Sequence, residues 1–205
     1  GSRILVERSI HARFVEAIVE KARRIRVGDP MDPATRMGPL VTAVHRERVA
    51  GYVEQGKREG ARLVLGGGRP AGLGGGLDRG HWLEPTIFDQ VDPGMKIAQE
   101  EIFGPVVSVI PFDGEDDAVR IGNATPYGLA GAVWTRDIYR AFRVVKRLRA
   151  GIVWVNHMQP TYVEAPWGGM KMSGVGRELG RYGVDGYLEL KQVHVNLSEK
   201  PVGWY

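Results

Sequence analysis

Residues 99–106 read QEEIFGPV, and this stretch is the most informative part of the chain. It places two carboxylates and an aromatic side chain ahead of a Gly-Pro turn. The apolar run 106–111 follows directly and predicts a buried strand. Gly104 and Pro105 are assigned a conformational role, because such residues shape the turn that leads into a strand.

Strands and helices alternate on both sides of this stretch. Ser9 and Thr42 are the expected N-caps of two helices, and the first of these helices should end near Gly28. Helices of about ten residues that separate strands imply right-handed crossovers, so the sequence predicts an α/β fold with a largely parallel sheet. Further strands are expected at 3–6, 62–65, 129–134 and 152–155, and further helices at 115–123 and 137–149.

Residues 66–80 are rich in glycine and allow two interpretations. The first is a phosphate-binding loop, which needs a strand before it, a helix after it and usually a Gly-Lys-Ser/Thr sequence. Here the extended segment 81–87 follows instead. The second interpretation, a flexible surface connection, therefore fits the sequence better.

The composition excludes several classes of protein. The 205 residues are 43% hydrophobic and carry a net charge of +4, which suits a domain with a sizeable core. Acidic residues are interleaved with the basic ones and no nucleic-acid motif occurs, so the basic charge is interpreted as solvated helix faces. The chain has no Cys, and its five His residues lack metal-ligand spacing, so no metal site is predicted.

The sequence also lacks the marks of a membrane or secreted protein. No apolar run reaches the roughly 18 residues of a membrane helix, and the start is not of the secretory kind. We therefore expect a cytoplasmic protein that binds neither membrane nor nucleic acid.

Residues 187–197, YLELKQVHVNL, alternate apolar and polar side chains near the end of the chain. Such a segment can serve as an edge strand or as an arm exchanged between subunits. We accordingly divide the chain into residues 1–180 and a terminal strand and tail at 181–205.

Many motifs in order along the chain resemble the aldehyde dehydrogenase superfamily. They are GSRILV at 1–6, Gly38-Pro39, Glu84-Pro85-Thr86, EEIFGP at 100–105, Tyr127-Gly128-Leu129, GIVWVN at 151–156, PWGGMKMSG at 166–174, Gly176-Arg177-Glu178, Tyr187 and Lys191. The run 164–169 and the ending 201–205 are similar to the betaine aldehyde dehydrogenase branch. The resemblance implies that 1–180 is part of a catalytic domain, and that 181–205 carries an oligomerisation strand that joins copies of the protein.

The family reaction begins when a thiolate adds to an aldehyde, after which the adduct passes hydride to NAD or NADP. Water activated by a carboxylate then hydrolyses the thioester. Because this chain has no Cys, the resemblance implies that it is the carboxyl-terminal part of a longer enzyme, with the nucleophile and the general base upstream of Gly1. We expect the chain alone to be inactive and to bind NAD or NADP weakly or not at all.

The resemblance assigns cofactor binding to two residues of the 100–105 motif. Glu101 would accept hydrogen bonds from both hydroxyls of the nicotinamide ribose, and Phe103 would pack beside the nicotinamide ring. The alternatives are a solvent-facing carboxylate and an ordinary core aromatic. Glu100 is interpreted as structural.

Three further residues are expected at the substrate end. Trp167 could hold the cationic group of betaine aldehyde or an ω-amino aldehyde, or it could only form the wall of an apolar tunnel. Asn156 ends a predicted strand, where residues often face the ligand, and should order the backbone through its amide. His157 would line the substrate funnel, or be a structural histidine.

A second hypothesis belongs to another class of protein. The chain would then be a catalytically silent module that folds and associates through its terminal strand. Reduction of NAD+ in the presence of aldehydes separates the two hypotheses.

Overall fold

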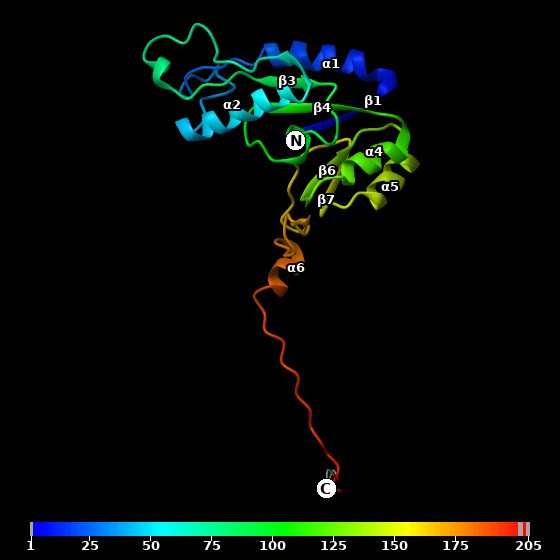
Figure 1. The fold of residues 1–205 in the computed structure, drawn as a ribbon. Helices are drawn as coiled ribbons and strands as arrows, with labels where there is room; N and C mark the ends of the chain where they lie inside the picture. Colours follow the sequence, from blue (N-terminus) through cyan, green and yellow to red (C-terminus); the bar gives the residue numbers. More distant parts are fainter. Residues whose placement is uncertain (1, 201–202, 204–205) are drawn as a thin grey trace.

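The computed structural model describes residues 2–200 and 203, which form a layered body and a long carboxyl-terminal arm (Figure 1). In chain order the elements are β1 (Arg3–Glu7), α1 (Arg8–Arg23), α2 (Ala43–Arg58), β2 (Arg62–Leu65), the 3-10 helix η1 (Leu77–Arg79), β3 (Thr86–Asp89), α3 (Lys96–Gln99), β4 (Val106–Phe112), α4 (Gly114–Asn123), β5 (Tyr127–Gly128), β6 (Ala130–Val133), α5 (Ile138–Arg147), β7 (Ile152–Val155), β8 (Met170–Lys171) and α6 (Gly180–Asp185).

The main sheet has four strands in the order β1-β4-β3-β2. Both β1 and β3 run parallel to β4, whereas β2 runs antiparallel to β3 at the edge. A parallel pair needs a long crossover, usually a helix, and the segment between β2 and β3 contains only η1. The predicted α/β fold with a largely parallel sheet is confirmed, with β2 as the antiparallel exception.

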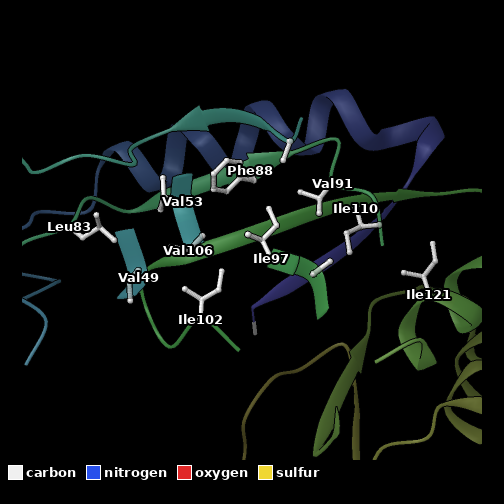
Figure 2. Packing of buried hydrophobic residues seen from close by; sticks show 12 residues of the cluster. Val49, Val53, Leu83, Phe88, Val91, Ile97, Ile102, Val106, Ile110 and Ile121 are labelled. Atoms are coloured by element: carbon white, nitrogen blue, oxygen red, sulfur yellow. The ribbon is translucent and has the colours of Figure 1, made fainter. Parts of the chain in front are cut away.

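Helices cover both faces of this sheet, because neighbouring residues of a strand point to opposite sides. On one face Ile87 and Val109 pack against α1. On the other face Phe88 and Ile110, both fully buried, pack against α2 and α3 (Figure 2). Burial of each such side chain contributes about 1.5–3 kcal/mol, so this second cluster fixes α2 and α3 on the sheet. The second cluster also contains Val49, Val53, Ile97, Ile102 and Val106.

A buried charge at the end of β3 ties three elements together. The carboxylate of Asp89 is fully buried, and its Oδ1 lies 2.9 Å from Nε2 of His11 on α1. Its other oxygen meets the guanidinium of Arg62 on β2. A buried carboxylate is tolerated only when it is paired in this way. Asp89 therefore links β3 to helix α1 and to strand β2.

A smaller unit lies beside the main sheet. Strands β6 and β7 form a two-stranded parallel sheet, and α5 joins them as the crossover helix. Helix α4 packs against α5, where Glu115 accepts a 2.9 Å hydrogen bond from Arg143. Strands β5 and β8 make a short antiparallel pair. This unit carries the residues predicted at the substrate end.

The structure corrects several predicted element boundaries. Thr42 is the N-cap of α2, as predicted, and its hydroxyl accepts a 3.1 Å hydrogen bond from His45 N. Ser9 is not a cap, because α1 already begins at Arg8 with Glu7 as its N-cap. Besides the short elements η1, β5, β8 and α6, two elements that build the main sheet and its cover were not predicted: the short helix α3, and β3, whose four buried residues lie in a segment that had been considered merely extended.

Residues 187–197 belong to no helix or strand of this chain, and they extend away from the body beyond α6 (Figure 1). Their apolar side chains are exposed, with Tyr187 93% and Leu190 fully accessible. A strand exists only where its backbone pairs with another, so the predicted oligomerisation strand stays a prediction, as does the division at 180/181. In the described part of the chain, no helix is both long and apolar enough to span a membrane.

Candidate functional site

The loop between α3 and β4 carries both residues predicted to bind a cofactor. Ile102 is buried in the core, whereas Glu101 and Phe103 on either side of it are exposed. Phe103 is 70% accessible, so it is not part of the core that the described residues of this chain form. The carboxylate of Glu101 makes no hydrogen bond or ion pair with any residue in the ranges 2–200 and 203. It is therefore free to accept hydrogen bonds from a ligand.

Helix α2 holds this loop from one side through three side chains. The Nε2 of His45 lies 2.6 Å from the carbonyl oxygen of Phe103, and Nη2 of Arg48 donates to the carbonyl of Ile102 at 3.0 Å. The hydroxyl of Tyr52 donates to Oε2 of Glu100 at 2.6 Å. The three side chains are three and four residues apart along α2, so they lie on one face of the helix.

Packing against α2 also restricts the backbone of the loop at residues 103 and 104. Phe103 has φ of 54°, a left-handed backbone that costs a non-glycine residue about 1–3 kcal/mol. A Cβ on Gly104 would lie 2.5 Å from Cγ1 of Val49, so only glycine fits there. The sequence prediction that Gly104 shapes the turn therefore has a steric cause, the contact with α2.

Glu100 is occupied by protein contacts, unlike Glu101. Besides Tyr52, it faces Lys96, whose Nζ is 3.8 Å from Oε1 and 5.7 Å from the centroid of the Tyr52 ring. The hydrogen bond to Glu100 raises the pKa of Tyr52 above its ordinary value, with smaller contributions from burial and from the carboxylate charge. These contacts agree with the interpretation of Glu100 as a structural residue.

A shallow depression of about 430 Å³ opens beside Phe103. Its walls come from residues 37–40, Leu83 and the turn 103–105, and most of them are apolar. Gly38-Pro39 had been noted only as a family motif, and nothing in its local sequence indicates that it lies against Phe103. An apolar surface of this kind suits the flat face of a ring.

The second group of predicted residues lies at the end of β7. The side chain of Asn156 bonds twice to Thr135, accepting from its N–H at 2.9 Å and donating to its carbonyl at 2.8 Å. Asn156 N also donates to the carbonyl of Val133 at 2.8 Å. These bonds join the ends of β6 and β7, which is the backbone-ordering role expected of its amide. His157 is exposed, and its Nδ1 accepts from Met158 N at 2.8 Å.

Trp167 has an aromatic neighbour that sequence reasoning did not find. Its ring centroid lies 6.2 Å from that of Trp154 on β7, with the planes tilted by 51°. The indole of Trp154 is fixed by a 3.2 Å hydrogen bond from Nε1 to the carbonyl of Pro160. Trp154 lies on β7 and Trp167 lies thirteen residues further along the chain, and no local pattern relates the two rings. Whether Asn156, His157 and Trp167 contact a substrate stays a prediction.

The structure brings the predicted residues together in two separate groups. Glu101 and Phe103 share one loop, and Asn156, His157 and Trp167 follow β7; within the described ranges no hydrogen bond or ion pair links the groups. Among those residues there is also no group of three His, Asp or Glu side chains that could hold a metal ion.

Comparison with known proteins shows the family to which the chain belongs. A profile of the aldehyde dehydrogenase family matches residues 1–193, and the chain belongs to that family. It is 47% identical to the betaine aldehyde dehydrogenase of Bacillus subtilis over all 205 residues, and 44% identical to the chloroplastic betaine aldehyde dehydrogenase of Atriplex hortensis. The chain spans about 40% of the length of these curated relatives.

Solved structures show the same similarity. A betaine aldehyde dehydrogenase of Staphylococcus aureus in complex with NAD+ is 42% identical to the chain, with a TM-score of 0.94. The match covers all of this chain and 40% of that one. A point mutant of that enzyme, also in complex with NAD+, matches with a TM-score of 0.95.

The contact between Tyr52 and Glu100 can be tested by titration. Because the pKa of Tyr52 is raised, its hydrogen bond is present below its ordinary pKa of 10, and its stabilisation is lost as the pH rises through the raised value. Ultraviolet difference absorbance should show a Tyr ionisation at a pH above the ordinary pKa of 10. Tyr52→Phe should remove this late step, whereas Tyr139→Phe, at an exposed position, should keep it. A late step that survives in Tyr52→Phe would contradict the assignment.

Proposed function

We propose that this chain forms the nicotinamide-ribose side and the substrate side of the active site of an NAD-dependent aldehyde dehydrogenase. The observation that carries the proposal is the exposed carboxylate of Glu101, which has no protein partner in the described ranges and stands beside the exposed ring of Phe103. The backbone of this loop is held by α2, so the points from which both side chains project would be set before a ligand arrives.

The residues of this chain would bind and orient the cofactor. A carboxylate accepts hydrogen bonds from two neighbouring hydroxyls, so Glu101 would hold the nicotinamide ribose. Phe103 and the apolar depression would cover the nicotinamide ring and keep water away from it. NAD, when bound, supplies the acceptor of hydride. The names of the solved relatives favour NAD over NADP.

We assign no nucleophile to this chain, because the sequence contains no Cys. The thiolate and the carboxylate that activates water would belong to the part of the relatives that these residues do not match. For the same reason the chain alone should oxidise no aldehyde and should bind NAD+ weakly, since it would hold only one end of the dinucleotide.

The proposed substrate is betaine aldehyde or an ω-amino aldehyde. Both carry a cationic nitrogen, and the face of a Trp attracts such a group when water is excluded. Trp167 is held by two backbone hydrogen bonds to Glu178, each 2.7 Å, and by contact with Trp154. A rigid indole at this position could define the cationic end of the substrate, while Asn156 and His157 would line the approach.

A second candidate function concerns residues 187–197. Their apolar side chains are exposed, including Val193 and Val195 at 72% and Leu197 at 89%. An alternating segment with unpaired backbone gains stability when it joins the edge of a sheet in another copy of the chain. We propose that this segment makes homo-oligomers, a role that fits an enzyme subunit and a catalytically silent module equally well.

The cofactor assignment can be tested in a full-length enzyme. In the betaine aldehyde dehydrogenase of Bacillus subtilis, the matching region is replaced by this chain, giving a chimera. Glu101→Gln should lower kcat/KM for NAD+ by about ten- to a hundredfold, because charge-assisted hydrogen bonds to the ribose are lost. Glu16→Gln, on the exposed face of α1, is the matched control and should have no effect. A folded chimera that reduces no NAD+ would refute the proposed function, and so would an active one indifferent to Glu101→Gln.

The substrate assignment needs a pair of aldehydes of equal shape. Betaine aldehyde and 3,3-dimethylbutanal differ only in a cationic nitrogen replaced by carbon. Trp167→Ala in the chimera should lower kcat/KM for betaine aldehyde by about two- to thirtyfold more than for the neutral aldehyde, which is the range of a cation–π contact. Equal losses with the two substrates would show that Trp167 contributes only an apolar wall.

A further inference from the structure

We propose that His45 and Arg48 of α2 are positioning residues, which set the directions of Glu101 and Phe103 by holding two successive backbone carbonyls. This inference rests on the proposed function and assigns to α2 a part in cofactor binding. It depends on contacts that join residues 54 and 58 positions apart in the sequence.

The two carbonyls flank the α-carbon of Phe103. The carbonyl of Ile102 belongs to the peptide plane before Phe103, and the carbonyl of Phe103 belongs to the plane after it. Peptide planes are rigid, so the orientations of these two planes determine φ and ψ of Phe103. Those angles in turn fix the direction in which its ring leaves the backbone. Arg48 and His45 each hold one of the planes.

Without these hydrogen bonds, the free energy of Phe103 would fall if its φ became negative. Its φ of 54° lies in the left-handed region, which is unfavourable for a residue with a side chain. Relaxation to a negative φ would turn the ring away from the depression that it now borders. The hydrogen bonds from α2 oppose this relaxation.

Glu101 is held between two fixed points. On one side Tyr52 binds the side chain of Glu100, and on the other Arg48 binds the carbonyl of Ile102, whose side chain is buried in the core. Between these two points, the side chain of Glu101 has no hydrogen-bond or ion-pair partner in the described ranges. The same helix face therefore determines the position of the carboxylate and of the ring together.

The chemistry of the His45 contact also limits what this residue can do. A carbonyl oxygen only accepts hydrogen bonds, so Nε2 of His45 must carry the proton. Both the imidazolium and one neutral tautomer satisfy this condition. His45 therefore acts as a donor to the backbone, and Nε2 is not available to accept a proton as a base.

The chimera tests this proposal with paired variants. His45→Leu and Arg48→Met remove the donors, whereas His45→Gln and Arg48→Lys keep one. Each of the first two should lower kcat/KM for NAD+ by about three- to tenfold, as expected for one hydrogen bond, while the conservative variants should restore most of it. Arg46→Met removes a cation from the same helix that, among residues 2–200 and 203, pairs with Glu47 alone, at 4.0 Å, and it should have no effect.

A second measurement separates positioning from direct contact with the cofactor or a general loss of structure. In a chimera that already carries Glu101→Gln and Phe103→Ala, breaking either contact from α2 should cost little more, because the groups that it positions are gone. The full additional loss in that background would overturn the proposal, as would failure of the conservative variants to rescue. If Arg48→Met does not fold, the two His45 variants decide the question.

The two proposals fail in different ways. If Glu101→Gln lowers kcat/KM for NAD+ while His45→Leu and Arg48→Met do not, the cofactor site stands and the positioning role of α2 is wrong. If Glu101→Gln has no effect, the proposed function itself is wrong.

Discussion

The arrangement of the site depends on the contact between one face of α2 and the loop that precedes β4. Three side chains of the helix bind the loop at successive points, and Val49 from the same helix leaves no space for a side chain at residue 104. Helix α2 is itself fixed to the sheet by the buried cluster around Phe88. Helix α2 is therefore packed on the sheet by its buried side chains and hydrogen-bonded to the loop by its polar ones. The loop that carries the exposed carboxylate and the exposed ring is held against the core in this way.

Features with a local cause could be predicted from the sequence. Thr42 caps α2 because a hydroxyl at that point can reach the third following N–H, and residues 106–111 form a strand because they are apolar and bounded by a turn. Glu101 and Phe103 were found through the family motif, and the structure places both at the surface. Such inferences need only a few neighbouring residues.

The remaining features come from contacts between distant residues, which no local pattern encodes. Arg48 and Ile102 are 54 residues apart, and nothing near either one indicates the other. The pairing of Trp154 with Trp167 and the depression formed by residues 37–40 arise in the same way. Helix α3 is too short to show a helical period, and residues 187–197 have the pattern of a strand but pair with no strand of the described ranges. Sequence reasoning therefore named the candidate residues and missed the contacts that hold them.

In the proposed site, Glu101 and Phe103 bind the nicotinamide end of the cofactor. A crystal structure of the chimera with NAD+ bound measures this most directly. The account predicts that the carboxylate oxygens of Glu101 lie within about 3 Å of both hydroxyls of the nicotinamide ribose, with the ring of Phe103 against the nicotinamide. A structure in which other residues bind that ribose, while Glu101 points into solvent, would contradict it.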